Sequence, residues 1–221
     1  MNAIYRKVRI YFTKEGDARF LSHLDLMRTV ERALRRADLP VKFTEGMNPK
    51  VKMSFPTALP LGMESRCEVV ELQLPPEFTV AEICERLDRE LPDGLETFDG
   101  DVLFKGEKWA LTGISYRVFG SEDELPGDDE IARLLTQDQV RVQRRKKELD
   151  IKPLLQAAAR EDGRLAVSIA WTDNGTARPE DLLSALGRDP DDFRVVKVGM
   201  TFTSSLGEQV TKTNVAPNSD Q

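Results

Sequence analysis

The chain has 221 residues, 40% hydrophobic and 32% charged, a balance typical of a soluble globular protein with room for one large domain or two of about 100 residues. No apolar run approaches the ~20 residues of a membrane-spanning helix, and the N-terminal segment is too charged for a signal peptide, so we expect a cytoplasmic protein without a membrane partner. Cys67 and Cys84 lack the spacing of zinc or iron–sulfur ligands, so we expect no metal and no cofactor.

The net charge of −6 is unevenly distributed along the sequence. Residues 1–66 contain 13 Lys and Arg against 7 Asp and Glu, a charge of +6, whereas residues 67–221 carry −12. A basic first third attached to an acidic remainder favours one surface suited to an anionic partner. The alternative is an ordinary solvated surface whose charges have no partner molecule.

The first half of the chain alternates strand and helix patterns. Residues 4–13 place Val8, Ile10 and Phe12 on one side of a strand. Ser22 is a good N-cap for a helix whose apolar residues recur at steps of three and four, and Thr79 begins a second helix. We expect strands at 4–13, 41–44, 67–74 and 95–104, and helices at 23–38 and 79–91.

The second half has a similar pattern without detectable sequence identity to the first. We expect strands at 109–119, 140–146, 165–171 and 193–202, and helices at 128–136, 151–160 and 179–186. The order strand, helix, strand, strand, helix, strand is that of the ferredoxin-like split βαβ arrangement. The sequence therefore predicts an α+β fold with two tandem ferredoxin-like (βαββαβ) domains, residues 1–105 and 106–203, followed by a disordered tail at 204–221.

Two neighbouring segments carry a family resemblance. FLSHLDLMRTVERALRRADLPV and EGMNPKVKMSFPTALPLGMES resemble the signature of the radical-SAM-linked proteins, a bacterial family of unknown function. The resemblance is specific over about residues 4–75 and diffuse beyond, although KKELDIKPLL and Arg178-Pro179 are also similar. Its members occur alone or fused behind a radical SAM enzyme, often a cobalamin-binding one.

The resemblance implies a radical SAM enzyme as partner. This chain has no cysteine triad to hold a cluster, so it is not itself the radical enzyme. Relatives often carry a histidine near the Asn48-Pro49 turn, where this sequence has Lys50 and Val51. A loop histidine is therefore not essential here.

The polar side of the first helix carries a row of arginines. Arg28, Arg32 and Arg35 recur at steps of four and three and project together as a ridge, which is suited to tracking phosphates. The alternative is a solvated face on which Glu31 pairs with Arg28 and Arg35.

The loop at about 45–65 is longer than a ferredoxin-like hairpin requires, and long ordered loops are often functional. Lys50 and Lys52 place positive charge near Phe55, which we expect to stack on a base. The alternative is a flap that covers the sheet with Phe55 tucked inward. The predicted binding residues for RNA or a protein partner are Arg19, His23, Arg28, Arg32, Arg35, Asn48, Lys50, Lys52 and Phe55.

His23 is the only histidine and a weak candidate for a general acid or base, since imidazole titrates near neutrality. It has no second histidine, nearby tyrosine or activated nucleophile beside it in the sequence, and Asp25 fits a capping role with Ser22. We therefore predict no catalytic residue. The basic run 141–147 is either an extension of a nucleic-acid groove or a charged edge that opposes aggregation.

These observations favour a non-catalytic accessory protein that presents RNA, such as tRNA or rRNA, to a radical SAM enzyme. Two alternatives stay open. One is a metal-independent endoribonuclease that uses His23, and the other is a protein-binding adaptor that docks through the Phe55 loop.

Overall fold

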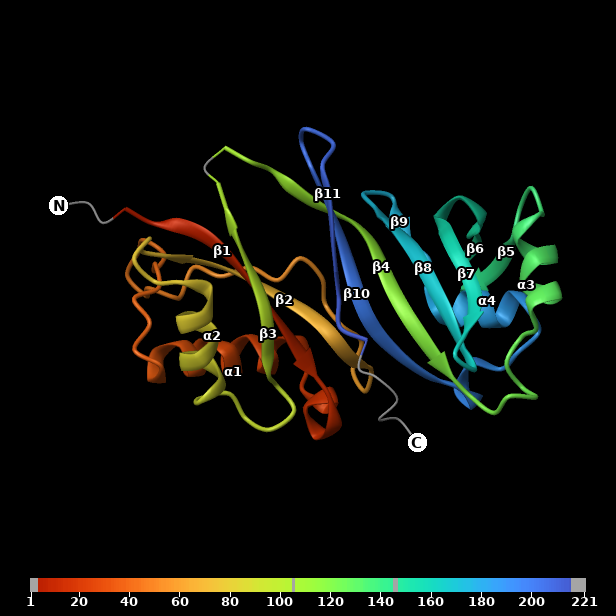
Figure 1. Cartoon of the computed structure of the whole chain (residues 1–221), viewed down its shortest axis with the longest axis horizontal. Helices are drawn as coiled ribbons and strands as arrows, with labels where there is room; N and C mark the ends of the chain where they lie inside the picture. Colours follow the sequence, from red (N-terminus) through yellow and green to blue (C-terminus); the bar gives the residue numbers. More distant parts are fainter. Residues whose placement is uncertain (1–3, 105, 145–146, 216–221) are drawn as a thin grey trace. The chain divides into compact units, whose positions relative to one another are not determined.

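A computed structural model describes residues 4–104, 106–144 and 147–215 (Figure 1). The chain divides into two compact units, Met1–Lys108 and Trp109–Gln221, here called unit 1 and unit 2. Each combines helices with antiparallel strands, so the chain has a mixed α/β fold.

Unit 1 is built on a three-stranded sheet with the order β3-β1-β2. Its elements are β1 (Arg6–Lys14), the 3₁₀ helix η1 (Gly16–Phe20), α1 (His23–Arg36), β2 (Glu64–Leu74), α2 (Val80–Asp88) and β3 (Thr97–Leu103). Ser22 caps α1 by accepting a hydrogen bond from the Asp25 backbone N–H, and Thr79 forms a capping box with Glu82. These two predicted caps are confirmed.

The core of unit 1 follows the alternation of β1. Val8 pairs with Leu72 and Ile10 with Val70, so these side chains share one face of the sheet. Both helices bury their apolar stripes against that face. The buried residues that they contribute are Leu26, Val30, Ala33 and Leu34 from α1, and Ile83 and Leu87 from α2.

The strand expected at 41–44 does not form. This segment folds back on itself: Phe43 pairs with Val51 in an isolated bridge, and the Lys52 N–H donates to the Lys42 carbonyl over 2.7 Å. The Lys42 N–H also donates to the Gln73 carbonyl of β2 over 2.9 Å, but the strand-like pairing of the segment is with residues 50–52 of its own loop. α1 ends at Arg36 rather than 38, because Asp38 adopts a left-handed conformation with φ 48°.

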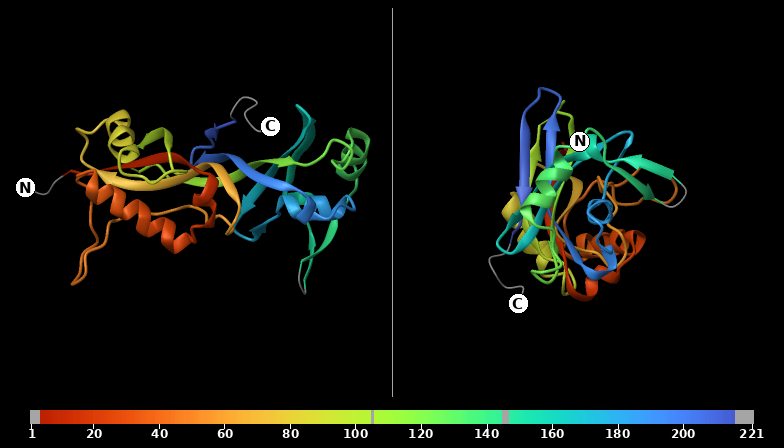
Figure 2. Two further views of the ribbon diagram at one scale, coloured as in Figure 1. Left: turned by 90° about the horizontal axis from the view of Figure 1, so that it is seen from below. Right: turned by 90° about the vertical axis from the view of Figure 1, so that its right-hand side faces the viewer.

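Unit 2 has a larger sheet with the order β10-β4-β8-β7. Two further strands extend it, β11 on β10 and β9 on β8, while β5 and β6 form a separate hairpin (Figure 2). The elements are β4 (Trp109–Phe119), α3 (Asp128–Leu135), β5 (Arg141–Arg144), β6 (Lys147–Asp150), η2 (Lys152–Leu154), β7 (Leu155–Glu161), β8 (Arg164–Thr172), β9 (Gly175–Thr176), α4 (Pro179–Ala185), η3 (Pro190–Asp192), β10 (Arg194–Ser204) and β11 (Gln209–Thr213).

The helix expected at 151–160 is wrong. After the short turn η2, residues 155–161 form strand β7, which pairs antiparallel with β8. Three consecutive alanines have high helix propensity, but Ala158 lies in the core while Ala157 and Ala159 point to the opposite face. Sheet pairing and this alternation override the propensity.

The tail expected at 204–221 is ordered in part, because β11 pairs with β10 from Gly199 to Thr203. Valine and threonines favour an extended chain there. Residues 216–221, and Arg145 and Lys146 of the basic run, lie outside the described residues. Two tandem ferredoxin-like domains stay a prediction, since unit 1 has no strand at 41–44 and unit 2 has a strand in place of a helix.

Candidate nucleic-acid interface

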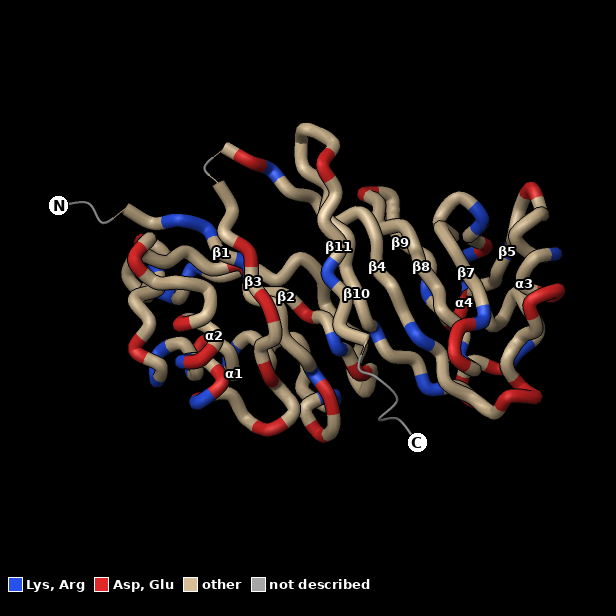
Figure 3. The backbone as a smooth tube through the Cα atoms, in the orientation of Figure 1, with Lys and Arg blue, Asp and Glu red and all other residues tan. Residues whose placement is uncertain are grey.

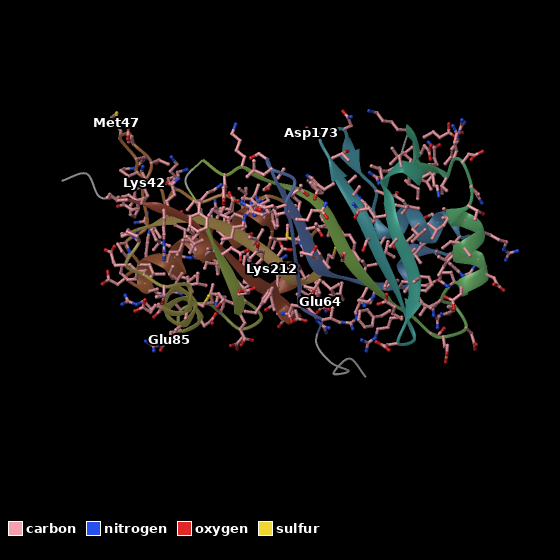
Figure 4. The ribbon with its side chains drawn as sticks, turned by 45° about the horizontal axis from the view of Figure 1, so that its top comes forward. Lys42, Met47, Glu64, Glu85, Asp173 and Lys212 are labelled. Atoms are coloured by element: carbon pink, nitrogen blue, oxygen red, sulfur yellow. The ribbon has the colours of Figure 1, made fainter. Side chains whose placement is uncertain are left out.

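A hairpin at residues 41–52 projects from unit 1 (Figure 2). The Phe43–Val51 bridge and two hydrogen bonds, Lys52 N to Lys42 O and Thr44 N to Lys50 O, hold its two arms together. Its tip, residues 45–49, lies in solvent with Met47 fully exposed. Figure 4 shows Met47 at the outer end of this hairpin and Lys42 nearer its base.

Three lysines share one face of the hairpin. Directly opposed residues in an antiparallel pair point to the same side, and neighbours along each arm alternate. The bridge puts Phe43 and Val51 on one side, so Lys42, Lys50 and Lys52 fall on the other. We call these three residues the lysine face. The Lys42 ammonium lies 5.6 Å from the centre of the Tyr5 ring, and Lys50 and Lys52 are exposed.

The other side of the hairpin meets helix α1. Val51 is buried in the core, whereas Phe43 stays 38% exposed with the guanidinium of Arg35 4.9 Å from its ring centre. Phe43 was not among the predicted site residues. The signal that could have found it is the alternation of lysines with apolar residues on both arms, Val41-Lys42-Phe43 and Lys50-Val51-Lys52.

The arginine ridge of α1 is largely paired with carboxylates. Asp25 lies 3.5 Å from Arg28, and Glu31 lies 2.8 Å from Arg35. Arg32 donates to the Thr29 hydroxyl at 3.4 Å. The ridge therefore resembles the solvated, self-paired face more than an uncompensated row of cations. Its net positive charge is smaller than the sequence spacing indicates.

Phe55 is turned inward. Its ring makes edge contacts with Phe12 at 6.4 Å and with His23 at 5.7 Å between ring centres, and it packs against the core of unit 1. It fastens the loop to the start of α1. The fold thus brings Phe55 and His23 together. Lys50 and Lys52 do not join them, because both belong to the hairpin.

Glu71 of β2 fastens the loop to the sheet at Ser54, which lies between the hairpin and Phe55 in the sequence. Ser54 and Glu71 exchange backbone hydrogen bonds of 3.0 and 2.8 Å, and the Ser54 hydroxyl donates to the Glu71 carboxylate. That carboxylate also accepts from Arg9 at 2.8 Å and from Lys7. Burial alone would raise the pKa of Glu71, but the hydrogen bonds from the two cations outweigh it and hold the pKa below its ordinary value.

Arg19 lies at the opposite end of the loop from the hairpin. Its guanidinium stacks 4.7 Å from the Phe20 ring centre and lies 3.3 Å from Glu64. The Gly62 N–H donates to the Arg19 carbonyl over 3.0 Å, which places Leu61 at this end of α1. Phe20, Leu24 and Leu61 are 58%, 62% and 68% exposed, and we call them the apolar group. None of these three residues is among the predicted site residues.

The family described as "Uncharacterized protein conserved in bacteria (DUF2344)" matches residues 7–179. The chain belongs to this family. The match includes α1, the hairpin and the apolar group, and continues through unit 2 to the first residue of α4. Comparison with curated proteins gives no match. A link to radical SAM enzymes stays a prediction.

The described part of this family member contains no group of three or more His, Cys, Asp or Glu that could hold a metal ion. In that same part, no helix is long and apolar enough to cross a membrane. Cys67 is buried, and burial is the main factor that raises the pKa of the half-buried Cys84 thiol. A thiol with a raised pKa is a poor nucleophile.

Proposed function

We propose that this protein is a non-catalytic RNA-binding accessory module, in which the hairpin of unit 1 contacts the phosphate backbone. The lysine face is the single observation that carries the proposal. Three ammonium groups share one side of a projecting element, and each neutralised phosphate releases counterions. On the opposite side, Phe43 offers a partly exposed ring beside Arg35 for contact with a base.

A second surface of unit 1 supports the accessory role. The apolar group lies at the N-terminal end of α1, whereas Arg35 and Phe43 lie at its C-terminal end. The 14 residues of α1 span about 20 Å, so one helix separates the two surfaces. Large exposed apolar side chains are typical of protein interaction sites. We assign the apolar group to the partner enzyme, which the family resemblance implies to be a radical SAM enzyme.

The surroundings of His23 do not favour the ribonuclease alternative. Its ring is half-buried with an edge contact to Phe55, and Ser22 and Asp25 beside it are hydrogen-bonded to each other in the helix cap. A general base must reach the proton that it abstracts. The contact with Phe55 gives His23 a packing role that accounts for its position without catalysis.

Charge reversal tests the proposal. In one variant Lys42, Lys50 and Lys52 become Glu. In a matched control three exposed residues outside the hairpin and the basic run 141–147, Arg89, Lys108 and Arg133, become Glu with the same change in net charge. We expect the hairpin variant to lose retention of tRNA and rRNA fragments at low salt, and the control to keep it. Circular dichroism checks that both variants are folded. Equal retention by the hairpin variant and the wild type would refute the proposal.

Crosslinking in cells separates the three hypotheses. The RNA-binding module should crosslink to RNA through the hairpin and to a protein through the apolar group, and Leu24→Asp should remove only the protein crosslink. An adaptor would give the protein crosslink alone. A ribonuclease would instead yield RNA with a defined cleavage site.

A further inference from the structure

Tyr5 lies directly before β1 and beside the lysine face. Its ring is partly exposed, and the Lys42 ammonium lies 5.6 Å from the ring centre. Lys42 points away from Phe43, so Tyr5 and Phe43 lie on opposite sides of the hairpin. Tyr5 is not among the predicted site residues. An RNA strand held by the lysine face therefore meets the Tyr5 ring on its own side of the hairpin.

Backbone hydrogen bonds fix the base of the hairpin beside β2. The Lys42 N–H donates to the Gln73 carbonyl over 2.9 Å, and the Lys52 N–H donates to the Lys42 carbonyl over 2.7 Å. Gln73 in turn is paired with Lys7 of β1. These four residues follow one another across this end of the sheet of unit 1. The base of the hairpin is therefore held in place relative to the start of β1.

The side chains at this end of the sheet lie on the face opposite the two helices. Val8 faces the helices, so its neighbour Lys7 points to the other face, and Gln73 directly opposite Lys7 points the same way. Tyr5 precedes Lys7 by two residues, and diagonal neighbours across a strand pair are within reach of aromatic and long side chains. Gln73 is the one residue of β2 that is not buried, and its amide both donates and accepts hydrogen bonds.

This end of unit 1 is rich in basic residues. β1 begins with Arg6 and Lys7, and Figure 3 shows basic positions where this strand begins. Lys7 is ion-paired with Glu71, and Arg6 donates to the Phe78 carbonyl. We therefore base phosphate binding on the lysine face rather than on β1. A polyanion attracted by the hairpin arrives beside the ring of Tyr5.

We propose that unit 1 binds single-stranded RNA, with one base stacked on Tyr5 and the adjoining phosphates on the lysine face. This inference rests on the proposed function and narrows its substrate class. Sites for single strands combine cations that follow the backbone with aromatic rings on which bases stack. In a duplex each base is already stacked on its neighbours, so a ring at the surface has no base to receive. Gln73 binds the edge of the stacked base, and Lys42, a flexible point charge, moves from the ring to a phosphate.

Fluorescence anisotropy tests the inference with two labelled RNAs of equal length, an unstructured oligouridylate and a self-complementary stem. We expect the wild-type full chain to bind the single strand more tightly than the stem. Tyr5→Ala should weaken binding of the single strand by at least roughly 5-fold, because stacking of a base on the ring is lost. Tyr5→Phe keeps the ring and should bind within about twofold of the wild type. Tyr5 lies outside the core of unit 1, and circular dichroism checks that both variants are folded.

Phe98→Ala is the matched control. It removes a partly exposed ring from the same sheet, but Phe98 contacts Tyr11, which follows Tyr5 by six residues, or about 20 Å of strand. We expect this variant to bind both RNAs as the wild type does. Photocrosslinking gives a direct readout of the stacked base. An oligouridylate that contains iodouridine should crosslink to a peptide that includes Tyr5, identified by mass spectrometry.

The outcomes separate this inference from the proposed function. If replacing the three lysines abolishes binding but Tyr5→Ala binds the single strand as the wild type does, the hairpin binds phosphates and stacking on Tyr5 is refuted. Equal weakening by Tyr5→Ala and Tyr5→Phe would also refute it, since the ring would then not be the group that binds. Tighter binding of the stem would overturn the single-strand assignment and leave the lysine face in place. If the lysine variant also binds as the wild type does, both proposals fail.

Discussion

The lysine face makes a quantitative prediction about salt. Each phosphate contact with single-stranded RNA contributes about 0.7 to the slope of log K against log salt concentration. Lys42, Lys50 and Lys52 share one side of the hairpin, and replacing all three by Gln should therefore reduce that slope by up to about 2. Between about 50 and 200 mM salt, wild-type affinity should fall roughly 20-fold more than that of the variant.

Fluorescence anisotropy with a labelled RNA, measured at several salt concentrations, gives both slopes. Arg28→Gln with Arg35→Gln is the matched comparison, because these cations already lie beside Asp25 and Glu31. We expect the arginine variant to change the slope less for each charge removed than the lysine variant does. A lysine variant with the wild-type slope would refute the assignment of phosphate contacts to the hairpin, even if its affinity were lower.

Two further predictions concern His23 and Glu71. Purified protein incubated with tRNA or rRNA fragments without metal should release no defined product, and His23→Ala should alter at most binding and stability. Site-specific cleavage that disappears in the variant would instead establish the ribonuclease. In such an enzyme, loss of a general base costs roughly 100-fold or more in rate. The pKa of Glu71 in the folded protein is held below its ordinary value, so the ionised carboxylate stabilises the fold. This stabilisation is fully present at pH values above the unfolded pKa of about 4.3. It is lost as the pH falls through the lower pKa of the folded state. Glu71→Gln should therefore be less stable than the wild type at pH 7, and the difference in thermal midpoint should shrink towards pH 3; a constant difference would contradict the assignment.

The sequence predicted well those elements whose local signals agree with their surroundings. Val8, Ile10 and Phe12 alternate because one face of β1 is buried, and Ser22 and Thr79 begin helices because their side chains satisfy free backbone N–H groups. The alanines of β7 misled the prediction, because sheet pairing outweighed their helix propensity. β11 was missed because a polar strand at the edge of a sheet has a weak pattern.

The candidate site was harder to predict than the fold. Spacing on a helix locates Arg28 and Arg35, but it does not reveal that Asp25 and Glu31 offset their charge. Two aromatic residues of the loop have opposite roles, and only the fold distinguishes them. Phe55 packs on Phe12, while Phe43 stays at the surface beside Arg35. The register of β4, β8 and β7, which places Ser115 beside Ser168, is likewise specified by no local pattern.

The loop between α1 and β2 also has an evolutionary consequence. It is fastened to the helix at both ends, by Phe43 against Arg35 and by Phe55 against His23, and Ser54 is bonded to the sheet between them. An insertion or deletion between residues 51 and 62 would move one contact out of step with the others. Length variation among relatives should therefore concentrate at the hairpin tip, residues 45–49, where the reach of the hairpin can change without loosening α1.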